Sequence, residues 1–358
     1  MPAQAVIEEL QKRGGWEIFY LGRKNAMEDD AARALEYQAI RSIANVTYLV
    51  LTTGRVQPKF FVNLGQSIKA FLKIFLGLGQ SLYLVLRYNP DVVLSFGGYM
   101  AVPVVFWAYL LGIPIATHEQ TVVSGRANKL LAKLADKVLV SWPETLSHFS
   151  KDKVVLTGNP LRQTVSAALA KKLPQAAGRR PLIYITGGSQ GSQAINAAVL
   201  SALPKLLKSY KVIHQTGDAN NSADFLALSR FTGANYQVKK FLDSVEVTKA
   251  FQLASLVVTR AGANIVTEVL AAGIPTLFIP IPWSPNQEQM ANAKMVVAVG
   301  LGEILPQDKL TGKSLVETVA KMLKNRQQYQ SHAVSARQLL LPDAASRIAD
   351  QVGAFIIS

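Results

Sequence analysis

The chain has 358 residues but contains no cysteine and only four histidines. Without thiols, disulfide frameworks, thiolate zinc sites and cysteine nucleophiles are all excluded. The histidines form no recognisable metal-binding motif, so we expect no metal site and no bound cofactor. Acidic residues are also scarce, with 23 Asp and Glu against 38 Lys and Arg, which gives a net charge of +15.

This excess of positive charge indicates a polyanionic partner, although it can also serve solubility alone. The candidates are nucleic acid, an anionic membrane surface and phosphorylated substrates. No nucleic-acid-binding motif occurs, and we expect no nucleic-acid partner. Hydrophobic residues make up 49% of the chain, which is enough for large cores in two domains of ordinary size.

Two apolar stretches raise the question of a membrane span, which needs about 20 apolar residues. Residues 97–117 are uncharged, but Pro103, Gly112 and Pro114 interrupt them, so a buried helix, a turn and a strand are the better interpretation. Residues 60–88 favour helices with a wide apolar face and a basic edge. Such helices either belong to the core or lie on anionic lipid, and the sequence leaves both open.

Short apolar runs alternate with helical patterns along the whole chain. In the first half, we expect strands at Trp16–Leu21, Val92–Phe96, Ile113–Thr117, Val138–Ser141 and Val154–Thr157. In the second half, we expect them at Leu182–Thr186, Lys211–Gln215, Tyr236–Lys240, Leu256–Thr259, Thr276–Ile279 and Gly302–Leu305. This alternation predicts an α/β protein with parallel sheets, in two doubly wound domains that face each other across a cleft.

In such sheets, ligands bind beyond the carboxyl ends of the strands. The stretch ITGGSQGSQAINAAV begins at Ile185, ends a strand in a glycine-rich turn and begins a helix near Ser192. Glycines allow close approach of the backbone, and free N–H groups at a helix start favour an anion such as phosphate. A purely structural turn is the alternative, since neither the P-loop nor the GxGxxG pattern matches.

The stretch RAGANIVTEVLAAG repeats this arrangement of strand, turn and helix after the strand expected at Leu256–Thr259. The strand ends at Arg260, the helix runs from about Asn264 to Ala272, and Gly273 caps it. Glu268 lies about one turn into the helix. Its carboxylate either stabilises the positive helix end or binds two vicinal hydroxyls, as on a ribose.

A polar loop, PIPWSPNQEQMANA, follows the next strand and leads into a helix. Its Glu288, Gln289 and Asn292 suit a sugar site, because amide groups both donate and accept hydrogen bonds.

The first half carries its own polar groups after strands. Tyr99 follows one strand, and His118 and Glu119 follow another, where they form a candidate acid–base pair or serve the structure. Arg162 follows the last strand of this half, where it either holds a diphosphate or lies at the surface between the domains.

The ordered set GGYM, HEQ…N, GNPLR, GGSQG, RAGA….E and Q..NA resembles the MurG family over essentially the whole chain. That family comprises the UDP-N-acetylglucosamine–N-acetylmuramyl-(pentapeptide) pyrophosphoryl-undecaprenol N-acetylglucosamine transferases. The resemblance implies a GT-B glycosyltransferase of peptidoglycan synthesis that transfers GlcNAc from UDP-GlcNAc to lipid I, with inversion, giving lipid II. It also implies that no metal is held by a DxD motif, and none occurs between the strands here.

The two series of strands, the stretch from Ala170 to Pro181 that is rich in Lys, Arg, Ala, Gly and Pro, and this resemblance together predict the domain layout. The resemblance also implies the partners. An N-terminal acceptor- and membrane-facing domain covers residues 1–165, a linker 166–180 and a UDP-sugar-binding domain 181–342, and a C-terminal helix at 343–358 packs back toward the first domain. The partners implied are UDP-GlcNAc, undecaprenyl-linked lipid I and an anionic membrane surface. The implied location is peripheral, on the cytoplasmic face of the cell membrane.

Site residues follow from the resemblance position by position. In the second domain, Glu268 takes the ribose hydroxyls, Leu242 holds uracil through its backbone, Ser189 reaches the nucleotide and Gln289 binds the GlcNAc hydroxyls. The turn that supplies amides to the diphosphate comprises Ala263, Asn264, Ile265, Val266 and Thr267. Arg162 and Thr121 are further donor contacts, and Tyr99, His118 and Glu119 face the acceptor, the last two as tentative catalytic groups.

Two departures from the family pattern affect this assignment. The family has Asn where this chain has Thr121, and a hydroxyl cannot reproduce every amide contact. The family also opens with a strand and a GGTGGH loop before the helix that MPAQAVIEEL matches. We therefore expect an N-terminally truncated sequence whose family base lies before Met1 and which binds UDP-GlcNAc poorly or turns over slowly. The codons upstream of Met1 test this expectation.

Two rival interpretations stay open from the sequence. One is another GT-B enzyme, such as a glycolipid synthase that uses a different UDP-sugar. The other is a degenerate subunit that binds nucleotide or lipid and is inactive because it is truncated. A panel of donors tests the first rival, and binding without transfer would favour the second.

Overall fold

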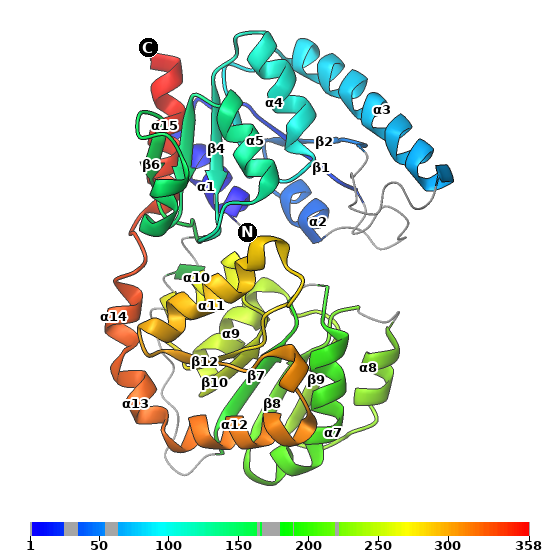
Figure 1. Cartoon of the computed structure of the whole chain (residues 1–358), viewed down its shortest axis with the longest axis vertical. Coiled ribbons are helices and arrows are strands. Elements are labelled where there is room, and N and C mark those ends of the chain that lie inside the picture. Colours follow the sequence, from blue (N-terminus) through cyan, green and yellow to red (C-terminus); the bar gives the residue numbers. More distant parts are fainter. Residues whose placement is uncertain are drawn as a thin grey trace. The chain divides into compact units, whose positions relative to one another are not determined.

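The computed structural model describes residues 2–24, 35–53, 64–162, 165–166, 180–188, 190–218 and 222–357. Ser189, residues 60–63 and almost all of the expected linker at 166–180 lie outside the described residues. The chain forms two compact units, each an α/β structure with its own parallel strands (Figure 1). The first unit comprises Met1–Gln120, Ser124–Arg162 and Asp343–Ser358, and the second comprises Thr121–Val123 and Gln163–Pro342.

The strands of the first unit are β1 (Ile18–Gly22), β2 (Val46–Val50), β3 (Val93–Ser95), β4 (Ile115–Glu119), β5 (Lys137–Val140) and β6 (Val154–Leu156). Its helices are α1 (Pro2–Arg13), α2 (Leu35–Arg41), α3 (Leu64–Tyr88), α4 (Ala101–Leu110), α5 (Arg126–Leu134), the 3-10 helix η1 (Pro143–His148) and α15 (Ala344–Ile357). Strands β3, β4, β5 and β6 form one parallel sheet in that order, and β1 pairs with β2 in another.

Two helix layers cover the sheet of β3 to β6. On one side, Val6 of α1 and Ile348 of α15 share an apolar cluster with Ala116 of β4 and Leu139 of β5. The C-terminal helix α15 therefore packs within the first unit, and Arg13 Nη1 donates to the Asp350 carboxylate at 2.7 Å. On the other side, α4 and α5 form a second apolar cluster with the start of β4.

Helix α3 is one continuous helix of 25 residues. Its inner side packs closely, because a Cβ on Gly77 would come 2.7 Å from the Thr53 side chain after β2. Trp107 of α4 donates from its indole nitrogen to the Leu78 carbonyl at 2.9 Å. The prediction of a helix, a turn and a strand at residues 97–117 is confirmed by α4 and β4, which are joined through Gly112 with a φ of +69°.

The second unit contains one parallel sheet of six strands in the order β12-β11-β10-β7-β8-β9. Its strands are β7 (Leu182–Thr186), β8 (Lys211–Gln215), β9 (Tyr236–Lys239), β10 (Leu256–Thr259), β11 (Thr276–Phe278) and β12 (Gly302–Ile304). Its helices are α7 (Gln193–Ser209), α8 (Ala223–Leu228), α9 (Ser244–Leu253), α10 (Ala263–Ala272), η3 (Pro285–Gln287), α11 (Glu288–Ala298), η4 (Gln307–Lys309), α12 (Gly312–Lys324), α13 (Arg326–Ser331) and α14 (Ala333–Arg337).

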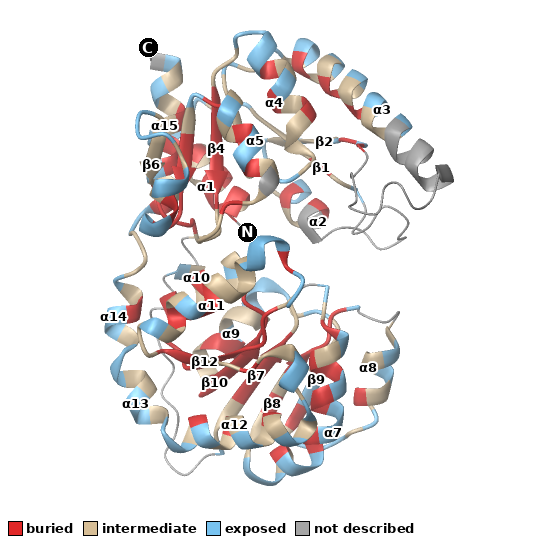
Figure 2. Ribbon diagram, in the orientation of Figure 1, coloured by how far each residue is buried: buried red, intermediate tan, exposed pale blue. Residues whose placement is uncertain are grey.

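The core of the second unit lies around its central strands, where red ribbon marks buried residues in Figure 2. Ile183 and Ile185 of β7 and Leu256 and Val258 of β10 are fully buried and pack against α7 and α12. Continuous burial on both faces explains why these strands are apolar runs without alternation. The predicted strands β7, β8 and β10 agree with the structure in both bounds.

Candidate functional site

Strand order places two predicted loops side by side in the second unit. From β7 the chain moves outward in one direction to β8 and β9, and then returns to the other side of β7 with β10. The two strands run in parallel register, with Thr186 opposite Thr259 at their carboxyl ends. This reversal of strand order is the position where open α/β sheets bind ligands.

The turn after β7 requires glycine at two positions. A Cβ on Gly187 would come 2.4 Å from the Ser192 nitrogen, and a Cβ on Gly191 would come 2.1 Å from the Thr216 carbonyl oxygen. Gly191 also has a φ of +80°. The turn ends at Ser192, the N-cap of α7, whose hydroxyl accepts from the Ile195 N–H at 3.3 Å. The glycines therefore bring the start of α7 close to the sheet.

Arg260 joins the two loops. Its Nη2 donates to the Ser192 hydroxyl at 2.6 Å and to Gln307 Oε1 at 2.7 Å, while Nη1 donates to the Ile279 carbonyl at 2.8 Å. The residue is 8% exposed, and Nε has no hydrogen-bond partner among the described residues. Burial lowers the pKa of the guanidinium to about 10, so it stays charged at neutral pH.

This buried cation has no carboxylate within ion-pair distance in the described part of the chain. Its positive charge adds to that of the amino ends of α7 and α10, which begin beside it. The carboxyl edge of β7 and β10 is thus an electropositive environment of fixed geometry, and such an environment suits a diphosphate.

Helix α10 carries one carboxylate, Glu268, in an otherwise apolar sequence, and its burial pattern explains this. Val266, Val269 and Leu270 are fully buried, whereas Asn264 is exposed and Glu268, four residues later on the same face, is half-buried. The N-cap is Gly262, which offers no side chain to the amides of the first turn. Burial raises the pKa of Tyr184 on β7, and the nearby charge of Glu268 raises it further.

Gln289 links the loop after β11 to the loop after β10, at the carboxyl edge of the sheet. Its Oε1 accepts from the backbone N–H of Ile281 at 3.1 Å and of Ala261 at 3.4 Å. Asn292, which is almost fully buried, donates from Nδ2 to the Ala261 carbonyl at 3.0 Å. Gln289 accordingly lies beside the loop after β10, with its Nε2 group not hydrogen-bonded to any described residue.

Leu242 lies one residue before the N-cap of α9, after β9. That N-cap is Asp243, whose side chain accepts from Val245 and Glu246 and completes a capping box. The neighbouring Phe241 is 41% exposed. The backbone at Leu242 is therefore held at a fixed helix start near the edge of the sheet.

In the first unit, His118 and Glu119 belong to β4 itself and do not follow it. Their expected place after the strand is therefore wrong, because β4 continues through both residues and neighbouring segments supply partners to His118 Nε2 and to the Glu119 carboxylate. The His118 Nδ1 atom has no hydrogen-bond partner among the described residues. His118 is fully buried, and its Nε2 donates to the Gly158 carbonyl at 3.0 Å. Burial lowers the pKa of His118 to about 4, so the ring is neutral at pH 7.

Glu119 is 3% exposed and is held by groups from α5. Its Oε2 accepts from Asn128 Nδ2 at 2.9 Å and from the Gly125 N–H at 3.1 Å. Asn128 in turn lies against Gly97, where a Cβ would come 2.1 Å from Asn128 Oδ1. The carboxylate thus fixes the loops after β3 and β4 against each other, which favours the structural alternative for this pair.

Three further expected site residues are Tyr99, Arg162 and Thr121. Tyr99 and Arg162 are half-buried in the first unit, and Thr121 donates its hydroxyl to the Val123 carbonyl at 2.7 Å. The structure brings Gln289 and the turn of α10 together within the second unit. The sequence-based site did not include Arg260 or Asn128. In the sequence, Arg260 is a cation at the end of a predicted buried strand, and this position could have identified it as a site residue.

No group of His, Asp and Glu within the described ranges could hold a metal ion. The amino ends at the sheet edge and the buried guanidinium are the positive groups that this structure provides for a phosphorylated ligand.

Comparisons with known proteins agree with this architecture. The models of the glycosyltransferase family 28 N-terminal and C-terminal domains match residues 1–140 and 182–348. The crystal structure of Acinetobacter baumannii MurG covers 99% of this chain and 95% of its own, with a TM-score of 0.70 and 28% identity. The glycosyltransferase SnogD from Streptomyces nogalater shares the fold, with a TM-score of 0.65 at 15% identity, and covers 99% of this chain and 95% of its own.

These similarities define a glycosyltransferase of the GT-B fold, as predicted. A UDP-N-acetylglucosamine–N-acetylmuramyl-(pentapeptide) pyrophosphoryl-undecaprenol N-acetylglucosamine transferase of Bacillus cereus is 32% identical over 353 residues, which cover 97% of this chain and 93% of that protein. The transferase of the same name from Trichlorobacter lovleyi is 31% identical over 371 residues, with 98% and 93% covered. The chain belongs to this family, the MurG family.

Proposed function

We propose that the chain transfers GlcNAc from UDP-GlcNAc to the muramyl sugar of undecaprenyl-linked lipid I, with inversion, and so forms lipid II. Membership of the family supplies the reaction class. The observation that carries the site assignment is the contact between Arg260 and Ser192, which joins the turns after β10 and β7 where the strand order reverses.

The donor is proposed to lie along the carboxyl edge of the second sheet. The diphosphate accepts hydrogen bonds from the free amides at the start of the turn Ala263–Thr267, in which the Val266 N–H already donates to the Gly262 carbonyl at 3.1 Å. Glu268 accepts from both ribose hydroxyls. Leu242 holds uracil through its backbone, Ser189 contacts the nucleotide, and Gln289 donates from Nε2 to the GlcNAc. Arg162 and Thr121 are proposed as further donor contacts.

The same positive groups assist the chemical step. When the bond between GlcNAc and the diphosphate breaks, negative charge grows on the leaving phosphate. Helix amides and the charged Arg260 are already oriented before the reaction, so they stabilise this charge without reorganising. Arg260 acts by fixing Ser192 and by its charge, and needs no contact with the donor.

On the acceptor side, Tyr99, His118 and Glu119 are proposed to face the muramyl sugar. The tentative catalytic roles of His118 and Glu119 stay predictions. Their contacts give more support to positioning, since the His118 ring is neutral and the Glu119 carboxylate already accepts from Asn128 and Gly125. In this role Glu119 holds the glycine loop at Gly97 through Asn128.

A membrane-contacting surface is proposed on α3 and the end of α4. The apolar residues Leu72, Leu76, Tyr83 and Leu86 lie on one side of α3 and are more than half exposed. Tyr109 and Leu110 at the end of α4 are also more than half exposed, and α4 packs on α3. Such an outward apolar face suits the interface of a membrane.

No described helix is long and apolar enough to cross a membrane. We propose that the chain binds peripherally to the anionic cytoplasmic face of the cell membrane, where its net charge of +15 adds to the apolar contact.

A donor panel tests the proposed function. The full chain is incubated with a soluble lipid I analogue and labelled UDP-GlcNAc, UDP-GalNAc or UDP-glucose, while UDP binding is measured by calorimetry. Transfer with UDP-GlcNAc at the highest kcat/KM is expected. A preference for another UDP-sugar would favour a different glycolipid synthase. Binding of UDP without any transfer would favour the degenerate subunit.

A further inference from the structure

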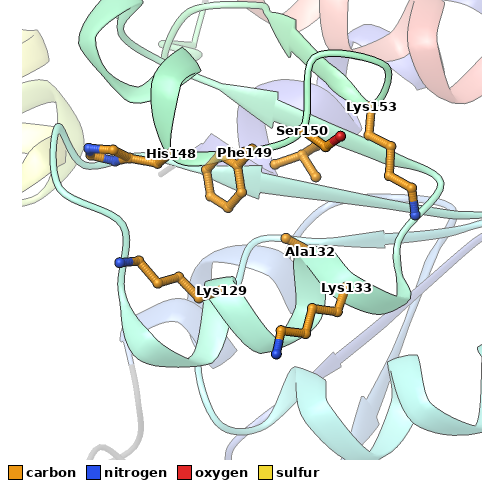
Figure 3. Close-up of a pocket in the computed structure, with 8 residues that line it drawn as sticks. Lys129, Ala132, Lys133, His148, Phe149, Ser150 and Lys153 are labelled. Carbon is orange, nitrogen blue, oxygen red and sulfur yellow. The ribbon is translucent and has the colours of Figure 1, made fainter.

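The first unit contains a cavity of about 400 Å³ between α5 and the segment that joins β5 to β6 (Figure 3). The ammonium groups of Lys129, Lys133 and Lys153 lie on different sides of the Phe149 ring, so they do not converge on one ligand atom. We assign no ligand to this cavity. In the second unit, by contrast, a set of buried polar groups converges on the turn after β7.

Tyr184 lies in the middle of β7, and its side chain is on the sheet face opposite to that of its neighbours. Ile183 and Ile185 pack against α7 and α12, whereas the Tyr184 ring packs edge-on against Phe251 of α9, with 5.5 Å between the ring centroids. The residue is 1% exposed, so its hydroxyl needs a partner inside the protein. Burial and the nearby charge of Glu268 raise the pKa of this hydroxyl, which therefore keeps its proton and can donate it.

Gln215, the last residue of β8, is the partner of this hydroxyl. Tyr184 donates to Gln215 Oε1 at 3.0 Å. At the other end of the same amide, Nε2 donates to the Gly188 carbonyl at 3.5 Å. Because a carbonyl can only accept, the amide nitrogen must face Gly188 and the amide oxygen must face Tyr184. Gln215 is 6% exposed, so this link runs inside the protein.

Gly188 is the residue of the turn after β7 that the link reaches. Its N–H donates to the Thr186 hydroxyl at 3.0 Å, and its carbonyl also accepts from the Gly191 N–H at 3.1 Å. It has a φ of +86°, and a Cβ at this position would meet no described atom within 4 Å. The peptide groups of Gly188 are thus fixed from within the protein, while the side on which a side chain would stand leaves room for a ligand.

We propose that Tyr184 and Gln215 are positioning residues for the UDP-sugar. They hold Gly188, and with it the turn after β7, in the conformation that receives the nucleotide, and neither needs to touch the donor. A turn that is already held loses less conformational freedom on binding, so the two residues act on donor affinity and not on the chemical step. This inference rests on the proposed function, because it concerns the same edge of the sheet.

Tyr184→Phe tests the proposal, because it removes the hydroxyl and keeps the ring against Phe251. Tyr329→Phe is the matched control, since its hydroxyl also donates to a side chain of the same sheet, Glu303 on the edge strand β12. Steady-state kinetics, calorimetric UDP binding and thermal unfolding are measured on the full chain. Both variants should unfold at a lower temperature. Only Tyr184→Phe should raise KM for UDP-GlcNAc and Kd for UDP, by about fivefold, while kcat changes by less than about twofold.

Gln215→Met interrupts the same link at its second residue. Because both substitutions break one link, Tyr184→Phe with Gln215→Met should weaken UDP binding no more than Gln215→Met alone. An unchanged UDP affinity in Tyr184→Phe, an equal loss in Tyr329→Phe, or additive losses in the double variant would overturn the positioning role and leave the proposed function intact. If the wild type binds no UDP, the proposed function fails and this inference fails with it.

Discussion

The guanidinium of Arg260 and the hydroxyl of Ser192, 68 residues apart in the sequence, are 2.6 Å apart in the structure. This contact joins the end of β10 to the start of α7 and places an uncompensated positive charge where two helices begin. In a family that uses UDP-sugars, a diphosphate in this place meets charge and amides that are already oriented.

Replacement of Arg260 tests this arrangement. Arg260→Met is expected to raise KM for UDP-GlcNAc about tenfold, because the charge and the hydrogen bond to Ser192 are both lost. Arg260→Lys should recover part of the affinity, since it restores the charge alone. The measurement is steady-state kinetics together with calorimetric UDP binding.

Arg337→Met is the matched control, because Arg337 donates to the carbonyls of Ala271 and Ala272 at the other end of α10. It should lower stability without weakening UDP binding. Equal effects of the two methionine variants on UDP affinity would refute the electrostatic role of Arg260.

The glycines of the turn after β7 differ in a way that stability measurements can resolve. Gly188 and Gly191 both have positive φ, but only a Cβ on Gly191 would meet other atoms, at 2.1 Å from the Thr216 carbonyl oxygen. Gly188→Ala is expected to cost about 1 kcal/mol of unfolding free energy, from backbone strain. Gly191→Ala should cost about 2–4 kcal/mol, because the backbone must also shift. Urea unfolding measures both, and similar costs would contradict the close packing.

Buried histidines should make stability depend on pH. The pKa of His118 is about 4 in the folded chain, against 6.5 for an ordinary histidine, so the unfolded state binds more protons between these values. Stability from this group is complete above pH 6.5 and is lost as pH falls toward 4, by about 1.4 kcal/mol per pH unit. His118→Gln should reduce this slope in urea unfolding at pH 4.5–6.5. An unchanged slope would show that His118 is not buried and neutral.

The outward face of α3 predicts how the chain binds lipid. Leu76→Glu with Tyr83→Glu should weaken binding to vesicles that contain phosphatidylglycerol by about tenfold or more. Each substitution replaces an apolar contact with a carboxylate that the anionic lipid repels. Leu226→Glu with Val245→Glu, at exposed apolar positions of the second unit, is the control. Flotation assays measure both variants. Equal weakening would mean that net charge alone governs the binding.

The sequence predicted the strands of the second unit well, because each is a short apolar run buried on both faces and bounded by turn residues. The sequence did not predict which polar residues lie inside strands or which distant segments contact each other. His118 and Glu119 suggested that β4 had ended, whereas both belong to β4, where His118 Nε2 donates to the Gly158 carbonyl and Glu119 accepts from Asn128. Strand β2 at Val46–Val50 was not predicted at all.

The donor-side residues were predicted from loops after strands and from resemblance, and they stay predictions, whereas Arg260 was not among them. A lone arginine at a strand end does not reveal its partners, since Ser192, Ile279 and Gln307 come from three other segments. Only the order of strands in the sheet brings them together. The same holds for Asn128, whose role depends on Gly97 and Glu119.

The central claim is that the second unit binds a uridine nucleotide at the β7–β10 edge, with Glu268 on the ribose. The most direct test compares calorimetric affinities for UDP and 2′-deoxy-UDP in the wild type, in Glu268→Ala and in the exposed control Glu317→Ala. The wild type and the control should prefer UDP by about tenfold, and Glu268→Ala should bind both ligands equally weakly. An undiminished preference for UDP in Glu268→Ala, or no binding of UDP by the wild type, would contradict the account.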